Sequence, residues 1–352
     1  MANSSASSEL WPDVLGRLLA GDDLPDDLVE ATFTQILTGA ATDAQIAGLV
    51  VGLRAKGESA SELAAMVRTT LSFAENLTIT PGSPLVDTCG TGGDRTGTVN
   101  VSTMAALIAA GAGARVVKHG NRASSSRCGS ADVLEELGVA IDLGPQGVAR
   151  CVEEVGIGFC FAPRFHASFR FAAAARRDLG VTTTFNLLGP LANPARVKHQ
   201  ALGVSDANMA EKMLITLAEL GSEHVLVFFG HDGFDELTTT TTSTIFELKA
   251  GSITNYKIDP TELGLANTTL ESLAGGDANT NAAIVDKTLA GEIGPVRDIA
   301  VLNAAAALVA ADHATDFSEG ISQAIAAIDS GAARAILESW VAVSSEARAS
   351  EA

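Results

Sequence analysis

Apolar side chains recur every three or four residues through residues 11–77, which is the spacing of one face of an α-helix. Two stretches that follow this spacing are Ile46, Leu49, Val50 and Leu53, and Leu63, Met66, Val67 and Leu71. The acidic pair at residues 22–23, ahead of Leu24 and Pro25, and Ser61 with Glu62 are typical of helix starts. The first part of the chain is therefore predicted to be entirely helical.

The pattern changes after the turn-forming residues 80–84, where Leu85 and Val86 open the first predicted strand. Short apolar strands then alternate with alanine-rich helical stretches, as in a parallel α/β sheet. Further strands are expected at residues 114–117, 140–143, 158–161 and 224–229, and the β-branched run 238–244 also suits an ordered strand. Helices are expected at residues 165–179, 271–289 and 297–311, and the tail after residue 343 is expected to fray.

These patterns predict an α/β protein in which a small all-helical N-terminal domain precedes a larger α/β domain. The larger domain is expected to contain a mostly parallel, doubly wound central sheet flanked by helices. The helical domain is expected to span residues 1–82, and the α/β domain residues 83–164 and 191–345. The helical stretch at about residues 165–190 could return to the N-terminal helices and complete their domain.

Composition supports a folded protein with two domains. The 352 residues are 47% hydrophobic and 18% charged, as in globular chains, and a chain of this length usually divides into two cores. Acidic residues outnumber basic ones 42 to 23, and the resulting net charge of −19 repels nucleic-acid phosphates. We therefore expect no nucleic-acid partner, and a polyanionic substrate must be held by local cations, backbone amides or a metal ion.

Other features of the sequence predict a cytoplasmic protein. The cysteines show no C-x-x-C spacing, which suits a reducing compartment; they are Cys89, Cys128, Cys151 and Cys160. Residues 1–9 lack the basic and apolar regions of a secretory signal. The longest apolar runs, residues 104–114 and 301–311, are shorter than the roughly 20 residues that a bilayer requires, so no membrane contact is expected.

The first segment with candidate chemistry is D-T-C-G-T-G-G-D at residues 87–94, between the first predicted strand and a helix that begins near Ser102. Glycines at this place let backbone amides approach an anion. The segment matches neither G-x-G-x-x-G nor a Walker A loop. Asn100, Ser102 and Thr103 then offer side chains favoured at a helix N-cap. A tight turn that requires glycine, followed by ordinary capping, would explain the same residues without a ligand.

A second candidate anion site follows the strand predicted at residues 114–117. The chain there continues K-H-G-N-R at residues 118–122 and A-S-S-S-R-C-G-S at residues 123–130. Cations, an amide and a hydroxyl-rich glycine loop lie at the carboxyl end of a strand, where open α/β sheets bind ligands. A solvated basic loop is the alternative interpretation, and a lone histidine such as His119 is more often structural than catalytic.

Acidic and basic side chains add a metal site and a carboxylate site to this picture. Asp235 and Glu236 follow the strand at residues 224–229, and adjacent loop carboxylates suit Mg²⁺. An Asp-Glu pair is usually an ordinary surface feature, but its position after a strand of the same predicted sheet favours the metal. Arg176 could bind a substrate carboxylate through two parallel hydrogen bonds, or it could complement a helix dipole, the role that we assign to Arg177.

Six motifs, in their order and spacing, resemble the anthranilate phosphoribosyltransferase family. They are G-T-G-G-D at 90–94, N-V-S-T at 100–103, K-H-G-N-R at 118–122, G-S-A-D at 129–132, N-L-L-G-P-L at 186–191 and D-E-L-T at 235–238. The match extends to about residue 340. It implies a helical domain completed by helices inserted later in the chain, a larger α/β domain that binds the phosphoribosyl donor, and a homodimer that associates through the helical domain.

The resemblance also implies a set of ligand contacts. Residues that resemble contacts to the donor, 5-phosphoribosyl 1-pyrophosphate (PRPP), are Gly90, Gly93, Asp94, Thr98, Asn100, Val101, Ser102, Thr103, Lys118, His119, Gly120, Asn121, Arg122, Ala123, Ser124, Ser125, Ser126 and Ser130. Residues that resemble contacts to anthranilate are Gly90, Asn121 and Arg176. Residues that resemble ligands of Mg²⁺ are Ser102, Asp235 and Glu236, and the resemblance implies two ions in each active site. Cys128 stands where the family usually has serine and is given no ligand role, and Val101 replaces a common isoleucine.

The implied reaction moves the phosphoribosyl group of PRPP to the amine of anthranilate and releases pyrophosphate, the second step of tryptophan biosynthesis from chorismate. Oxocarbenium character on the ribose and negative charge on the leaving group make metal ions and backbone amides the main catalytic elements. The aromatic amine is neutral at pH 7, so no general base is obligatory and His119 at most assists. Pyrimidine nucleoside phosphorylases, which share the two-domain plan and K-H-G, are the rival class, and the acidic pair at 235–236 favours a pyrophosphate donor.

Overall fold

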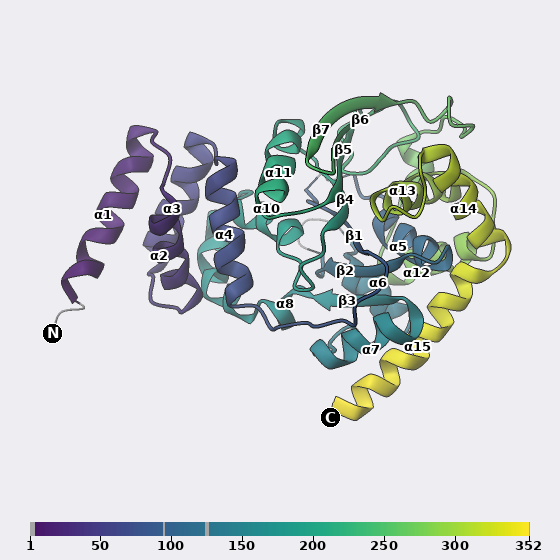
Figure 1. Ribbon diagram of the computed structural model, residues 1–352, viewed down its shortest axis with the longest axis horizontal. Coiled ribbons are helices and arrows are strands. Elements are labelled where there is room, and N and C mark those ends of the chain that lie inside the picture. Colours follow the sequence, from purple (N-terminus) through teal and green to yellow (C-terminus); the bar gives the residue numbers. More distant parts are fainter. Residues whose placement is uncertain (1–3, 94–95, 124–126, 352) are drawn as a thin grey trace.

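The computed structural model describes residues 4–93, 96–123 and 127–351. Its N-terminal block consists of α1 (Ser4–Ala20), α2 (Asp26–Leu37), α3 (Asp43–Lys56) and α4 (Ala60–Ser72), at the left of Figure 1. The predicted helical start of the chain is therefore confirmed. The start expected from Ser61 lies two residues earlier, because Ser59 accepts from the backbone N–H of Glu62 while the Glu62 carboxylate accepts from the backbone N–H of Ser59.

A single sheet of seven strands organises the rest of the described chain. Its strands are β1 (Leu85–Gly90), β2 (Arg115–Gly120), β3 (Ile157–Phe161), β4 (His199–Gly203), β5 (His224–Gly230), β6 (Ser243–Lys249) and β7 (Ser252–Ile258). Their order is β3-β2-β1-β4-β5-β6-β7. The first five are parallel, and β6 and β7 are antiparallel. The predicted α/β fold with a mostly parallel sheet is confirmed.

Helices cover both faces of this sheet. They are α5 (Val101–Gly111), α6 (Ser130–Glu136), α7 (Pro145–Val155), α8 (Ala162–Phe165), η1 (Ala167–Ala172), α9 (Ala173–Leu179), α10 (Thr184–Leu191), α11 (Ala207–Glu219), η2 (Leu270–Leu273), α12 (Ala278–Leu289), α13 (Pro295–Ala310), α14 (Phe317–Asp329) and α15 (Ala332–Glu351). α11 packs between the sheet and α4, while α5 and α13 cover the opposite face (Figure 1). η1, α9 and α10 pack against α2, α3 and α4.

The sheet separates two buried apolar clusters. On β4 and β5, Ala201 and Leu226 belong to the cluster that includes α5 and α13. Leu202 and Val225, their neighbours along each strand, belong to the cluster shared by α11 and the N-terminal helices. This alternation follows from the two-residue period of a strand. The N-terminal helices therefore share one continuous core with a face of the sheet.

Several expected elements differ in the structure. Residues 140–143 form no strand, because the amide of Ala140 donates to the Ser344 hydroxyl of α15, 3.1 Å away, instead of to a neighbouring strand. Residues 238–242 form a loop in which Thr238 and Thr239 are buried, and β6 begins only at Ser243. The helix expected at residues 165–179 is divided into α8, η1 and α9, and Gly180 ends it in the left-handed conformation.

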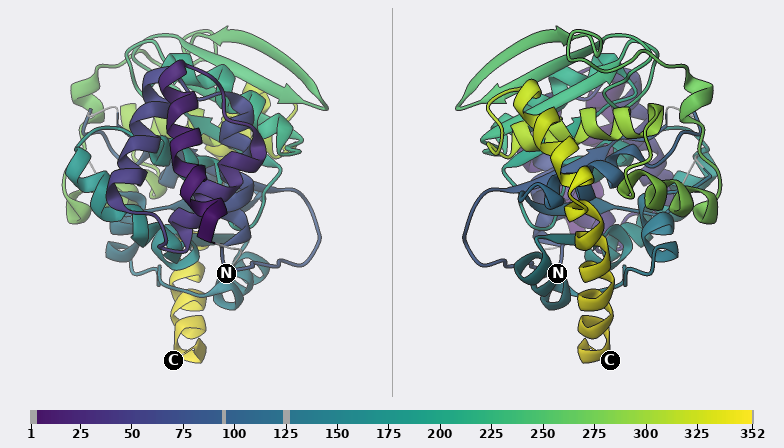
Figure 2. Two further views of the ribbon diagram at one scale, coloured as in Figure 1. Left: turned by 90° about the vertical axis from the view of Figure 1, so that its left-hand side faces the viewer. Right: turned by 90° about the vertical axis from the view of Figure 1, so that its right-hand side faces the viewer.

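The C-terminal half contains further differences. The helix expected at residues 271–289 begins at Ala278, because the Asp277 side chain caps it at the Thr280 amide. The tail after residue 343 does not fray. It is the last part of α15, which runs along the side opposite the N-terminal helices (Figure 2), and its Glu351 carboxylate accepts from the amides of Gly144 and Gly147 at the start of α7.

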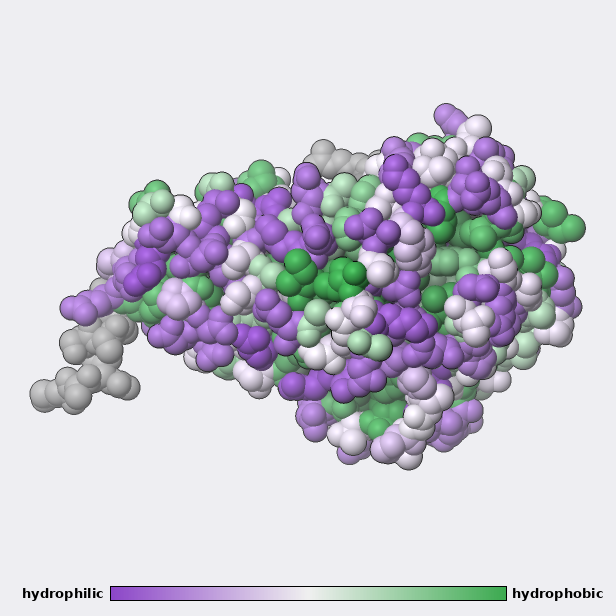
Figure 3. Space-filling model, turned by 45° about the horizontal axis from the view of Figure 1, so that its top comes forward, coloured by the Kyte–Doolittle hydropathy of each residue, from purple (hydrophilic) through white to green (hydrophobic). Residues whose placement is uncertain are grey.

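The surface is largely hydrophilic on the face drawn in Figure 3. Figure 3 shows one face of the molecule, on which hydrophilic residues predominate and apolar residues gather in smaller areas between them. None of the helices in the described part of the chain combines the length and the apolar character needed to cross a lipid bilayer.

Candidate active site

The candidate residues gather where the direction of the sheet's connections reverses. β2 and β3 lie on one side of β1, whereas β4 and β5 lie on the other. The carboxyl ends of β1 and β4 therefore lie at the switch point of the sheet, which is where open α/β sheets bind ligands. The glycine-rich turn after β1, the start of α5 and the loop with Asp235 and Glu236 all meet at this edge.

Glycines at the ends of β1 and β4 allow residue 235 to lie directly over the sheet edge. The amide of Gly92 donates to Asp235 Oδ2 at 2.7 Å. A Cβ atom on Gly90 would lie 2.5 Å from the same oxygen, and one on Gly203 would lie 1.7 Å from the Asp235 carbonyl oxygen. Gly93 has φ +88°, a conformation that side chains disfavour. The glycine-rich pattern thus reflects close backbone approach as well as turn geometry.

Glu236, Ser102 and Lys118 are joined by hydrogen bonds at the start of α5. Glu236 Oε1 accepts from the Ser102 amide at 3.1 Å, and Lys118 Nζ donates to Ser102 Oγ at 3.1 Å and to the carbonyl of Thr88. Of the three side chains that suit an N-cap, Asn100 stands at the cap position of α5 but makes no capping bond, because its side-chain oxygen accepts from Asn281 Nδ2 at 2.8 Å instead. A carboxylate 134 residues further along the chain therefore caps this helix.

The three predicted metal ligands, Ser102, Asp235 and Glu236, are brought together by these contacts. Both carboxylates belong to residues that are 8% exposed, and all three side chains offer oxygen atoms. Magnesium prefers oxygen ligands, with one or two carboxylates completed by water and substrate phosphates. The donor set therefore fits Mg²⁺.

His119 is held as a neutral imidazole. Its Nδ1 lies 2.9 Å from the Gly189 carbonyl, which can only accept, so Nδ1 carries the proton. Nε2 has no hydrogen-bond partner among the described residues and carries the lone pair. Burial, and then the neighbouring His166 ring, lower the pKa of His119 to about 3. His119 therefore cannot supply a positive charge to a phosphate near neutral pH.

The sequence did not predict the buried hydrogen-bond network around Asp87. Its carboxylate accepts from the His119 amide at 3.1 Å and from Asn193 Nδ2 at 2.9 Å, and Asn193 also donates to the carbonyl of Val117. Burial raises the pKa of Asp87 to about 6, although the Lys118 charge opposes this shift. A charged residue inside an apolar strand was an available signal, but its partner Asn193 lies 106 residues away.

The loop after β2 is held by carboxylates of α6. Arg122 contacts Asp132 at 3.0 Å and Glu135 at 2.8 Å, and these ion pairs raise the pKa of Arg122 above its usual value. The other oxygen of Asp132 accepts from the amides of Ala123 and Gly129. An anion at this loop would therefore compete with Asp132 and Glu135 for Arg122.

The remaining residues that resemble donor contacts lie in this loop and at the start of α5. Asn121 is exposed, and its side chain accepts from the Arg122 amide at 2.7 Å. Gly120 ends β2, where a Cβ atom would lie 2.3 Å from Ser130 Oγ. Thr98, before α5, pairs with Ala274. Val101 and Thr103 are buried in the first turn of α5. Predictions for Asp94, Ser124, Ser125 and Ser126 fall outside the described residues.

Arg176 occupies a place suited to a carboxylate ligand. It lies on α9, half-buried, with its guanidinium carbon 5.3 Å from the centre of the Phe185 ring. None of the carboxylates in the described ranges forms an ion pair with it, and burial lowers its pKa. The next residue, Arg177, is exposed and lies 3.6 Å from Asp178. Arg176 therefore has the surroundings expected of a ligand contact, and Arg177 has those expected of a structural cation.

A second group of titratable residues lies at the amino ends of β4 and β5, the opposite edge of the sheet. Ligand atoms of His199, His224 and Asp312 lie within 4.8 Å of one another. Both ring nitrogens of His224 already contact carboxylates, those of Asp312 at 2.8 Å and Glu247 at 2.9 Å. Lys249 Nζ lies 3.2 Å from Asp312. These groups are already paired with one another, and a metal ion bound to Asp312 would have to displace the ammonium group of Lys249.

Comparison with known proteins extends the similarity to nearly the whole chain. Residues 12–74 match the family model described as "Glycosyl transferase family, helical bundle domain", and residues 82–334 match "Glycosyl transferase family, a/b domain". Anthranilate phosphoribosyltransferase of Roseiflexus castenholzii is 51% identical over 95% of this chain and 98% of its own length. That of Thermobifida fusca is 50% identical over 98% of this chain and 99% of its own length.

Solved structures show the same relationship. The crystal structure of anthranilate phosphoribosyltransferase from Thermus thermophilus has a TM-score of 0.89 and 40% identity, and the match covers 94% of this chain and 99% of the other. The enzyme from Saccharomyces cerevisiae, in complex with PRPP and Mg, has a TM-score of 0.87 and 26% identity, with 96% and 98% of the two chains covered. The sequence motifs, the fold and these matches agree, and the chain belongs to the anthranilate phosphoribosyltransferase family.

Proposed function

We propose that this protein transfers the phosphoribosyl group of PRPP to the amine of anthranilate, giving N-(5-phosphoribosyl)anthranilate and pyrophosphate in tryptophan biosynthesis. The observation that carries the proposal is the meeting of a glycine-rich turn, a helix start and two buried carboxylates at one edge of the sheet. Membership of the family gives the substrates. A half-buried arginine without a carboxylate partner in the described ranges supports anthranilate as the acceptor.

The donor is proposed to bind across the carboxyl ends of β1, β2 and β4. Backbone amides of residues 90–93 and of the first turn of α5 face the pyrophosphate, and Lys118 adds a buried cation through Ser102. In the present structure, Asp235 and Glu236 accept from two of these amides. Mg²⁺ bound by Ser102, Asp235 and Glu236 would neutralise the departing pyrophosphate, and we propose two such ions. The loop at residues 118–130 would cover the donor.

The reaction needs little proton transfer by the protein. As the bond from ribose C1 to pyrophosphate breaks, positive charge develops on the sugar while the amine of anthranilate approaches C1. Arg176 and Asn121, with the glycine turn at Gly90, position the acceptor, Arg176 by binding its carboxylate. The new C–N bond leaves an arylammonium group, a strong acid that water can deprotonate. The lone pair on His119 Nε2 could accept that proton but is not required.

The function is tested by following anthranilate fluorescence in the presence of PRPP, first with Mg²⁺ and then with excess chelator. Loss of fluorescence that requires the metal and releases pyrophosphate is the expected result. If anthranilate is not consumed, the proposed reaction is wrong, and the next substrates to assay are pyrimidine nucleosides with phosphate.

Three further assignments belong to the same proposal. The helical domain comprises residues 1–82 with the inserted helices at about 165–190, and the α/β domain residues 83–164 and 191–345. The protein forms a homodimer through the helical domain, which the exposed apolar side chains of Leu19 on α1 and Val51 on α3 support. It acts in the cytoplasm, where its four buried thiols remain reduced. Burial raises the pKa of the Cys128 thiol to about 11, which agrees with the absence of a ligand role.

A further inference from the structure

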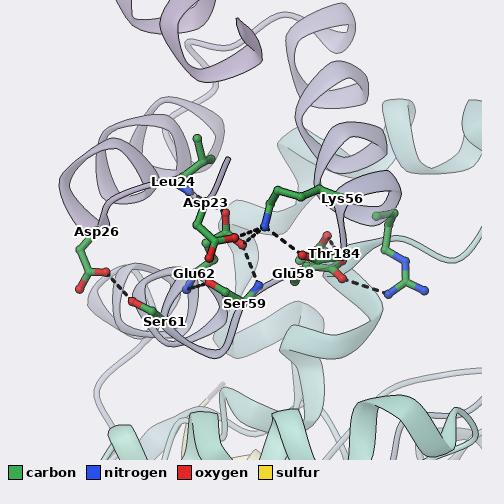
Figure 4. A network of polar contacts seen from close by, with 11 residues as sticks. Asp23, Leu24, Asp26, Lys56, Glu58, Ser59, Ser61, Glu62 and Thr184 are labelled. Atoms are coloured by element: carbon green, nitrogen blue, oxygen red, sulfur yellow. Dashed lines mark hydrogen bonds and ion pairs between the residues drawn. The ribbon is translucent and has the colours of Figure 1, made fainter. Parts of the chain in front are cut away.

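A buried hydrogen bond joins the N-terminal helices to α10. Glu58 lies in the short turn between α3 and α4, and Thr184 is the first residue of α10. Thr184 Oγ1 donates to Glu58 Oε1 at 2.7 Å (Figure 4). Glu58 is 1% exposed and Thr184 is fully buried. A carboxylate buried this deeply must keep its partners, because an unpaired buried charge is strongly unfavourable.

The turn that carries Glu58 is itself held firmly. The other Glu58 oxygen accepts from Arg54 at 3.2 Å. Four residues later, Glu62 accepts from Lys56 Nζ at 2.9 Å and from the amides of Leu24 and Ser59, both at 2.8 Å (Figure 4). These contacts connect the ends of three helices in the N-terminal block. Glu58 is therefore a fixed point to which α10 is attached.

The other end of α10 contacts the candidate active site. The carbonyl of Gly189, near the end of α10, lies 2.9 Å from His119 Nδ1, and the carbonyl of Ala192 lies 2.9 Å from His166 Nε2. α10 thus extends from a hydrogen bond with the helical block at its start to hydrogen bonds with two histidines at its end.

Phe185 connects this helix to Arg176. It directly follows Thr184, is 2% exposed, and its ring lies under the Arg176 guanidinium at 5.3 Å. Phe33 of α2 and Phe169 of η1 also contact this ring, with centroid distances of 5.7 and 5.5 Å. The position of the Arg176 guanidinium therefore depends on a ring whose neighbour in the chain is held by Glu58.

We propose that the Glu58–Thr184 hydrogen bond positions the acceptor site, so that both residues help to select anthranilate through Phe185 and Arg176. The inference rests on the proposed function, in which Arg176 binds the anthranilate carboxylate. Neither residue touches a substrate; each acts by fixing the start of α10. Loss of the bond displaces the start of α10, and with it Phe185 and Arg176. Gly189 at the other end of the helix keeps its bond to His119, and the turn after β1 and the start of α5, which bind PRPP, keep their own contacts.

The test compares Thr184→Val, which keeps the shape but removes the hydroxyl, with Thr184→Ser, which keeps the hydroxyl. Thr69→Val is the matched control, because Thr69 is also buried in the helical block but donates only to the Ala65 carbonyl of its own helix. Thr184→Val should raise the KM for anthranilate at least five-fold and change the KM for PRPP less than two-fold. Thr184→Ser and Thr69→Val should leave both constants within two-fold of the unsubstituted protein.

A double-mutant cycle separates positioning from general loosening of the fold. If Thr184 acts through Arg176, Thr184→Val should have less than a two-fold effect on the anthranilate KM once Arg176→Ala is present. Equal rises in both KM values, an unchanged anthranilate KM, or full additivity with Arg176→Ala would overturn the inference. Should Thr184→Val not fold, Glu58→Gln takes its place in the same cycle. If the unsubstituted protein does not convert anthranilate, the proposed function fails before any variant is compared.

Discussion

Arg176 and Arg177 are consecutive residues on α9 with different surroundings. Arg176 is half-buried over the Phe185 ring, and Arg177 is exposed beside Asp178. A guanidinium that is partly shielded from water and lacks a carboxylate partner in the described ranges binds a substrate carboxylate more strongly than an exposed one does. Arg177 therefore serves as the matched control for a substitution of Arg176.

Arg176→Ala should raise the anthranilate KM more than ten-fold and change the PRPP KM less than three-fold, because the acceptor carboxylate loses its cation. Arg177→Ala should leave both constants within two-fold. Steady-state kinetics with each substrate varied in turn would measure this, and an unchanged anthranilate KM for Arg176→Ala would remove Arg176 from the acceptor site.

Glu236 has two tasks, capping α5 at the Ser102 amide and contributing to the proposed metal site. Glu236→Gln keeps a hydrogen-bond acceptor for the cap but removes the charge that Mg²⁺ requires. We expect the concentration of Mg²⁺ for half-maximal activity to rise at least ten-fold, with a melting temperature close to that of the unsubstituted protein. An unaltered magnesium titration would place the metal elsewhere.

At the scale of elements, the site depends on the loop of residue 235 crossing the end of β4. The crossing requires a residue without a side chain at 203, since a Cβ atom there would lie 1.7 Å from the Asp235 carbonyl oxygen. β4 itself is covered on both faces, so the loop cannot be accommodated by moving the strand.

Gly203→Ala should therefore displace the loop, destabilise the protein by on the order of 2 kcal/mol, and abolish most magnesium-dependent activity. The control is Gly16→Ala in α1, where the added Cβ would meet no described residue beyond the adjoining backbone of its own helix and alanine should stabilise the helix by about 0.5–1 kcal/mol. Urea unfolding and turnover measure both effects. A Gly203→Ala protein with ordinary stability and metal dependence would contradict this account of the crossing.

At the scale of the whole molecule, buried titratable groups link folding to pH. Burial lowers the pKa of His119 to about 3 and that of His166 to about 4. In the unfolded chain the pKa of each histidine is near 6.5. As the pH falls, the unfolded chain therefore binds protons that the folded protein does not bind, and the folded state loses stability. Asp87 acts in the opposite sense. Its pKa is raised to about 6 in the folded protein, so its protonation stabilises the folded state as the pH falls from about 6 to about 3.8.

The two histidines outweigh the single aspartate, so the free energy of unfolding should fall as the pH is lowered from 7.5 to 5. Each net proton contributes about 1.4 kcal/mol per pH unit, and the expected loss is on the order of 2 kcal/mol. Urea unfolding at the two pH values measures it. His166→Gln, which cannot titrate, should remove about three quarters of the loss, because the remaining histidine is then largely offset by Asp87, and equal stability of the unsubstituted protein at both pH values would be inconsistent with two neutral buried histidines.

The helical start of the chain, the parallel α/β plan and the segments that carry the site could all be predicted from the amino-acid sequence alone. These features depend on local causes, namely apolar periodicity, glycines after strands and caps before helices. Asp235 and Glu236 could be selected because they follow a strand of the same sheet as the two anion loops. The family was equally accessible, since its motifs are read along the chain.

The pairs of side chains that meet across the molecule could be known only from the folded chain. Residues 140–143 look like a strand, yet the amide of Ala140 is satisfied by Ser344, 204 residues later. Glu236 caps α5, Asn193 holds Asp87, and Glu58 holds the start of α10, and each of these bonds joins residues more than 100 positions apart. Such contacts have no period and no local signal, because a hydrogen bond depends on the distance between two atoms in space and not on their separation along the chain.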